Sequence, residues 1–270
     1  SIKVPHLLDL EISLPPLPEQ KRIANILSSF DNKIELLREQ NKTLENIAQT
    51  IFKQWFIDFN FPDNNGKPYK DNGGKMINSE LGLIPEGWEV TNLKNLGDIV
   101  CGKTPSKKNP KNFNGDIPFI KIPNMNHMFV TETEDSLSDM GVKKVENKVI
   151  PQNSICVSCI ATVGKVSITT QYSVTNQQIN SIIPKEKFLE YTYFSMKFLK
   201  KDLQQIGNRG STTLNINTGM FKEIKIIFPP NFLLKKFHSL SSFYINKIEE
   251  NFFSLENIVE IRKTLLQSLI

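Results

Sequence analysis

The fold of this chain follows from a stretch that occurs twice, as EISLPPLPEQ at residues 11–20 and as KIIFPPNFLL at residues 225–234. In each copy a short β-like run meets a Pro-Pro break, and a long segment without glycine follows. The copies align without a gap at an offset of 214 residues, so that NKIE at 32–35 matches NKIE at 246–249. A strand-like run, a break and a long helix are therefore expected at both ends, with a different segment between them.

The first long segment has the pattern of a helix that pairs with another helix. Pro18 and Glu19 suit a first helical turn, and no proline follows until Pro62. Positions three and four residues apart form a heptad seam: Ile34, Leu37, Asn41, Leu44, Ala48, Ile51 and Trp55. The second copy keeps the register at Ile248, Asn251, Leu255, Ile258, Arg262, Leu265 and Leu269. We predict that the two helices pair as a coiled coil; ordinary amphipathic helices in a bundle are the alternative.

The middle of the chain reads as a globular head. Residues 60–79 are rich in turn formers and are expected to be a linker. Within residues 80–230, strand-like runs at 117–122, 154–161 and 165–170 alternate with turns, and residues 189–206 look helical. The predicted fold class is therefore α+β, with a mixed α/β head and two long helices, 19–59 and 231–270.

The charge and the cysteine count restrict the class of protein only loosely. The net charge is +5, and residues 81–230 hold 18 Lys and Arg against 13 Asp and Glu, which is compatible with nucleic-acid binding. An odd three cysteines argue against a disulfide scaffold, and no apolar run reaches the roughly 20 residues of a membrane span. We expect a cytoplasmic protein.

Motifs for catalysis are missing from the sequence. The chain has no G-x-x-x-x-G-K-[ST] loop, no glycine fingerprint after a strand and no evident Ser, His and Asp set. It also lacks the Asn/Asp-Pro-Pro-aromatic tetrad of adenine methyltransferases. Cys156 and Cys159 have metal-ligand spacing without a second pair, so buried small residues are the favoured interpretation. We expect no catalytic residue, no metal site and no cofactor in this chain.

Three polar segments of the head are candidates for nucleic-acid contact. Residues 101–111 place lysines and hydroxyls in a Pro/Gly-broken loop, which suits phosphates; a solvated basic loop is the alternative. Residues 175–180 carry amides that can read an adenine edge or can simply satisfy a turn. In residues 207–215 an arginine stands between two glycines, which leave room for a backbone or a guanine to approach it closely. The candidate DNA-binding residues are Lys103, Thr104, Ser106, Lys107, Lys108, Lys111, Asn176, Gln177, Gln178, Arg209, Ser211 and Thr212.

Several segments resemble one protein family. The chain resembles the specificity subunit of type I restriction-modification systems across nearly its whole length. The matching segments are LPPLPEQKRIA at 14–24, TLENIAQTIFK at 43–53, WFIDF at 55–59, GLIPEGW at 82–88, GKTPS at 102–106 and NGDIP at 114–118. The first two are specific, and the short GKTPS loop is less so.

The resemblance implies a division of labour. Family members have two target recognition domains, each reading half of a split DNA site, with antiparallel helices that set the spacing and hold two methyltransferase subunits. Here residues 80–230 would be a recognition domain, and residues 1–18 the tail strand of a preceding one. Methylation with S-adenosylmethionine, and ATP- and Mg-dependent cleavage, would belong to the methyltransferase and restriction subunits.

One departure from the family pattern matters. A complete member carries two recognition domains, whereas this sequence contains one, as in a half-subunit, a fragment or a product of recombination. Two copies related by a twofold axis would read a palindromic split site, although a different second half is also compatible with the weaker match of the second repeat. The rival function is a coiled-coil interaction module that modulates such a complex without reading DNA.

Overall fold

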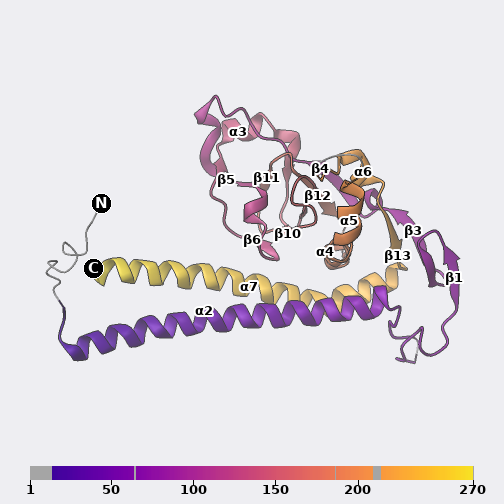
Figure 1. Cartoon of the computed structure of the whole chain (residues 1–270), viewed down its shortest axis with the longest axis horizontal. Helices are drawn as coiled ribbons and strands as arrows, with labels where there is room; N and C mark the ends of the chain where they lie inside the picture. The colour runs from indigo at the N-terminus through magenta and orange to yellow at the C-terminus, as the bar shows by residue number, and fades with distance from the viewer. Residues whose placement is uncertain (1–13, 64, 186, 209–213, 270) are drawn as a thin grey trace. The chain divides into compact units, whose positions relative to one another are not determined.

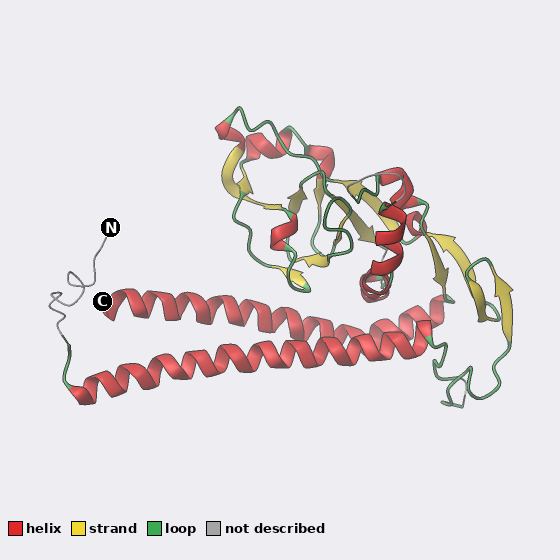
Figure 2. Ribbon diagram, in the orientation of Figure 1, coloured by secondary structure: helices red, strands yellow, loops and turns green. Residues whose placement is uncertain are grey.

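The structure, a computed structural model, describes residues 14–63, 65–185, 187–208 and 214–269. Among these described residues, the strands all lie between the two long helices in the sequence, together with several short helices. Figure 2 colours the strands yellow and the helices red. The predicted α+β class is confirmed. The chain divides into two compact units, residues 1–42 with 250–270, and residues 43–249. Within the described residues, no helix is both long and apolar enough to cross a membrane.

The two long helices form where the repeat predicts them. Helix α2 spans Leu17–Phe52 and continues as a π-helical turn, and α7 spans Asn231–Leu269 (Figure 1). In the first unit, Asn251 Nδ2 donates to Asn41 Oδ1 at 2.9 Å, and Arg262 Nε lies 2.7 Å from Asp31 Oδ1. Since a later residue of α2 contacts an earlier residue of α7, these parts of the helices run antiparallel. The supercoil of a coiled coil stays a prediction.

About half of the described positions of the predicted heptad seam are buried, and the others are half-buried. Ile34, Leu37 and Asn41 of α2 are buried, as are Ile248 and Asn251 of α7. The polar seam positions are accommodated in pairs, because Asn41 bonds to Asn251 and Arg262 reaches Asp31. Apolar burial thus stabilises the contact while the polar pairs restrict its register.

The described residues of the second unit form four sheets. A five-stranded sheet has the order β4-β12-β9-β10-β6, a four-stranded sheet the order β7-β5-β11-β8, and two-stranded sheets pair β1 with β2 and β13 with β3. The strands are β1 Met76–Ser79, β2 Gly82–Pro85, β3 Glu89–Asn92, β4 Gly97–Cys101, β5 Phe113–Ile120, β6 Phe129–Val130, β7 Ser136–Leu137, β8 Val149–Ile150, β9 Ile155–Ser158, β10 Val166–Thr169, β11 Ser173–Thr175, β12 Ile179–Pro184 and β13 Lys225–Phe228.

The short helices are α3 Asp139–Lys143, α4 Leu189–Phe198, α5 Lys200–Gly207 and α6 Thr218–Lys222. The single helix expected over 189–206 is therefore two helices. The break falls at Leu199, whose ψ of 3° departs from the helical value.

The head has a core on each face of its four-stranded sheet. Phe119 of β5 packs in one cluster with Leu137 and Val174, whereas the next residue, Ile120, packs in the other with Ile150 and Ile179. Successive side chains of a strand point to opposite faces, so β5 contributes to both cores. Strand β5 is thereby packed on both faces up to its last residue, Ile120.

Helix α4 attaches the head to the neighbouring ends of the long helices, within residues 43–249. Its Phe194 ring lies 5.6 Å from that of Phe52 in α2. Lys197 and Tyr193 both bond to the Glu45 carboxylate, and His238 Nδ1 of α7 lies 2.9 Å from the buried Glu190. Aromatic packing, the Lys197–Glu45 ion pair and the His238–Glu190 contact together make this junction part of the same compact unit.

Candidate nucleic-acid interface

Strand pairing brings two of the predicted segments together. Strand β11 pairs parallel to β5, with Thr175 opposite Ile120, so both strands end at the same edge. The loop after β4 reaches this edge: Gly102 N donates to Ile179 O at 3.1 Å, and Lys103 N donates to Thr175 O at 2.9 Å. The loop at 102–111 and the turn at 175–178 therefore lie side by side.

Gly102 permits this close approach. A Cβ at this position would lie 2.2 Å from both Asn176 O and Thr175 Oγ1, far inside van der Waals contact. A residue without a side chain is therefore required where the loop passes the turn. The glycine is a packing requirement of the site.

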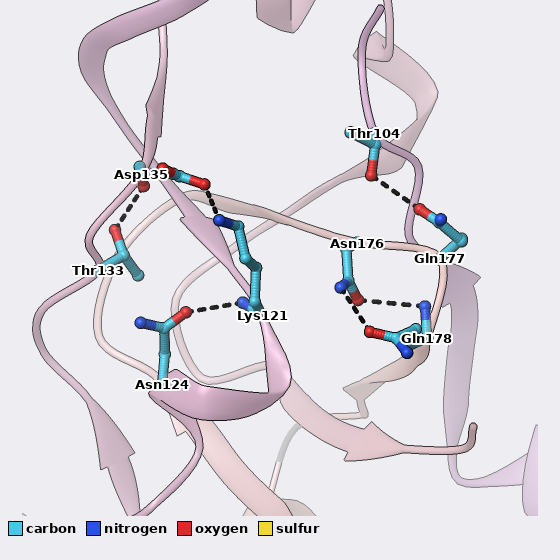
Figure 3. Close-up of polar contacts among 8 residues, drawn as sticks. All are labelled: Thr104, Lys121, Asn124, Thr133, Asp135, Asn176, Gln177 and Gln178. Atoms are coloured by element: carbon cyan, nitrogen blue, oxygen red, sulfur yellow. Dashed lines mark hydrogen bonds and ion pairs between the residues drawn. The ribbon is translucent and has the colours of Figure 1, made fainter. Parts of the chain in front are cut away.

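A side-chain bond joins the loop to the turn. Thr104 Oγ1 donates to Gln177 Oε1 at 2.7 Å (Figure 3). Gln177 is exposed and Thr104 is half-buried, so the contact lies at the surface. Two of the predicted residues thus touch, although 73 positions separate them in the chain.

Asn176 and Gln178 bond to each other within the turn. Gln178 N donates to Asn176 Oδ1 at 3.1 Å, and Asn176 Nδ2 donates to Gln178 Oε1 at 3.0 Å (Figure 3). The side chain of Asn176 is therefore used to build the turn, which was one of the two interpretations of the sequence. Gln177 and Gln178 remain the candidate readers.

The basic loop carries exposed lysines on a defined backbone. Asn109 caps a short 3-10 helix by accepting from Lys111 N at 3.2 Å, and Asn112 Nδ2 donates to Ser106 O at 2.9 Å. Lys103, Lys107, Lys108 and Lys111 are exposed, as is Ser106. Within the described residues these lysines form no ion pair, so their charges are available to an anionic ligand.

The third predicted segment is described only at its ends. Arg209, Ser211 and Thr212 lie outside the described residues. On either side of them, Asn215 N donates to Gly207 O at 3.1 Å, and Leu214 O accepts from Ala161 N at 2.9 Å. Cys159 links these flanks to the turn, because its N donates to Gln178 O and its O accepts from Ile216 N, both at 2.8 Å.

The structure adds polar residues at the same edge that the sequence analysis missed. Lys121 follows β5, forms an ion pair with Asp135, and donates its backbone N–H to Asn124 Oδ1 at 2.8 Å (Figure 3). Its neighbour Ile120 accepts from Asn176 N at 3.0 Å, which brings this group beside the turn. No run of similar residues marks Lys121 in the sequence; only the pairing of β5 with β11 reveals it.

The CxxC cysteines are packing residues. Burial raises the pKa of Cys156 to about 12 and the pKa of Cys159 to about 11, so both thiols stay protonated near neutral pH. In the described part of the chain, no three His, Cys, Asp or Glu side chains gather as a metal site. Burial and the Glu45 carboxylate likewise hold the pKa of the Tyr193 hydroxyl well above its usual value, so it acts as a donor in the α4 junction.

The chain belongs to the family described as "Type I restriction modification DNA specificity domain", which matches residues 1–46 and 85–264. The chain is 36% identical to the type I restriction enzyme HindI specificity subunit of Haemophilus influenzae, over 97% of this chain and 68% of that protein. It is 30% identical to the MjaIX specificity subunit of Methanocaldococcus jannaschii, over 100% of this chain and 62% of that protein.

A solved structure supports the fold. The S subunit of the type I restriction-modification system from M. genitalium superposes with a TM-score of 0.64 at 16% identity, covering 100% of this chain and 65% of that chain. The chain thus spans about two thirds of the length of these relatives. The family is a non-catalytic class within restriction-modification complexes, which agrees with the lack of catalytic motifs in the sequence.

Proposed function

We propose that this chain reads one half-site of a split DNA sequence for a type I restriction-modification complex. The observation that carries the proposal is the meeting of the basic loop and the amide-bearing turn at one edge of the head. Exposed lysines suit phosphates, and glutamine amides suit base edges in the major groove. In the proposal the phosphate contacts come from Lys103, Thr104, Ser106, Lys107, Lys108 and Lys111, and the base contacts from Gln177, Gln178, Arg209 and Thr212. Ser211 belongs to the same DNA-binding set, and Asn176 shapes the turn that carries Gln177 and Gln178.

The proposal assigns separate tasks to separate segments. Residues 80–230 are the recognition domain, 60–79 the linker, and 19–59 and 231–270 the spacer helices. The spacer helices bind methyltransferase subunits and, through them, the restriction subunit. Residues 1–18 are the tail strand of a preceding recognition domain. Methylation and cleavage are the work of those partner subunits, with their own S-adenosylmethionine, ATP and Mg.

A second half-site requires a second recognition domain. Because this sequence contains one head between two related helices, two copies in a symmetric arrangement would supply it. A different half-subunit is the other source. The two cases predict different DNA sites, a palindromic split site for two copies and an asymmetric one for two different halves.

The decisive experiment is selection of bound duplexes from a random library by this chain together with its methyltransferase partner. Enrichment of a split palindrome would support reading by two copies, and an asymmetric site would support a different second half. If no sequence is enriched above salt-dependent background, the proposal is wrong. The rival reading, an interaction module that ignores DNA sequence, is not favoured by the family membership.

A further inference from the structure

A chain of hydrogen bonds starting at the protein backbone sets the orientation of one side-chain amide at the candidate interface. The backbone N–H of Gln178 can only donate, so the Asn176 atom 3.1 Å away must be the oxygen Oδ1. The NH2 group of Asn176 is then on the other side of its amide, and it donates to Gln178 at 3.0 Å. An NH2 group needs an acceptor, so the Gln178 atom must be Oε1. Nε2 of Gln178 consequently occupies the opposite side of that amide (Figure 3).

The turn that carries these amides is held from three neighbouring segments. Asn176 N donates to Ile120 O at 3.0 Å, at the end of β5. Asn176 O accepts from Ile179 N at 3.2 Å, and Gln178 O accepts from Cys159 N at 2.8 Å. These bonds fix the backbone on both sides of Gln177. Reversing the Gln178 amide would therefore break its bond from Asn176, and the backbone could not shift to form another in its place.

The Nε2 group of Gln178 is the last group in this series of hydrogen bonds. Gln178 is half-buried, and among the described residues its Nε2 group forms no hydrogen bond. It is also not one of the fully buried polar atoms without a partner, so it keeps some exposure to solvent. Gln177 differs, because its amide oxygen contacts the Thr104 hydroxyl, and a hydroxyl can donate or accept.

We infer that Asn176 is a positioning residue, which acts through Gln178 by holding its amide so that Nε2 donates a hydrogen bond to an acceptor on DNA. This inference rests on the proposed function and names the chemistry of one contact. The acceptor has two sources: a base edge in the major groove, such as N7 or O6 of guanine, or a phosphate oxygen. Asn176 itself makes no contact with DNA in this arrangement.

The test reverses the amide chemistry at two positions and compares base preferences. In Gln178→Glu an oxygen replaces Nε2 while Asn176 keeps its bond partner. In Asn176→Asp the carboxylate still accepts from Gln178 N but can no longer donate to Oε1, so the Gln178 amide reverses and turns Oε1 outward. Both variants are selected against the same random library as the unchanged chain, with its methyltransferase partner. Gln171→Glu, at an exposed residue two positions before the start of β11, controls for the added negative charge.

If Gln178 reads a base, both variants should change the preference at the same base pair, roughly tenfold, towards a base that offers a donor. If Gln178 contacts a phosphate, both variants should weaken binding to all sequences alike, whereas Gln171→Glu should leave binding unchanged. The inference is overturned if Gln178→Glu behaves like the control, or if the two variants act on different base pairs. Unchanged thermal unfolding confirms that each variant is folded. Loss of all enrichment by the unchanged chain would instead contradict the proposed function itself.

Discussion

At the scale of single residues, replacing Gly102 tests whether DNA binding requires contact between the loop and the turn. Gly102→Ala would force Cβ against two backbone oxygens of the turn, and overpacking of this kind costs about 1–3 kcal/mol. We expect lower stability in chemical denaturation and weaker DNA binding, because the loop is displaced from Gln177.

The matched control for this variant is Gly219→Ala in α6. A Cβ there would meet only the Asn217 side-chain oxygen, at 3.2 Å, a contact that a shift of a few tenths of an ångström relieves while Asn217 still accepts from Met220 N. The free energy of unfolding should change by less than about 1 kcal/mol. Normal stability and DNA binding of Gly102→Ala would show that the close approach is unimportant.

The exposed lysines make a second prediction at the residue scale. Replacing Lys103, Lys107, Lys108 and Lys111 with Gln should weaken binding to all sequences alike. The slope of log affinity against log salt should become shallower by about 0.9 for each lysine that contacts a phosphate. Fluorescence anisotropy over a salt series measures this slope. Lys67→Gln with Lys70→Gln is the control, and a full slope in the quadruple variant would remove the loop from the interface.

At the scale of elements, the buried Asn41–Asn251 pair tests the contact between α2 and α7. Asn251→Leu leaves Asn41 Oδ1 without its partner, which should cost about 1–3 kcal/mol. Leucine at both positions should restore or exceed the original stability, since Asn41 Nδ2 is already buried without a partner. A double-mutant cycle followed by circular dichroism measures the coupling. A coupling near zero would mean that the two asparagines do not meet.

At the scale of the whole molecule, the prediction concerns the number of copies. One chain carries a single head, and a symmetric pair would supply the second recognition domain. Light scattering at micromolar concentration should then give twice the 30.9 kDa of one chain. A monomer under these conditions would favour a different second half-subunit.

The long helices and the fold class could be predicted because their signals are local. A helix repeats every 3.6 residues, so the seam from Ile34 to Trp55 is visible in a short window, and the repeated Pro-Pro break marks where each helix begins. The break at Leu199 was missed, because residues 189–206 keep a helical composition on both sides of it.

By itself, the sequence determined the two helices, the α+β head between them, the family, and the three segments proposed to contact DNA. Only the tertiary structure decided that Thr104 meets Gln177, that Lys121 lies beside the turn, and that Asn176 faces Gln178 rather than solvent. The physical reason is how far apart in the sequence the interacting residues lie. Helical periodicity arises between residues three and four apart, whereas the edge of the head is assembled by strand pairings between distant residues, whose register no local pattern records.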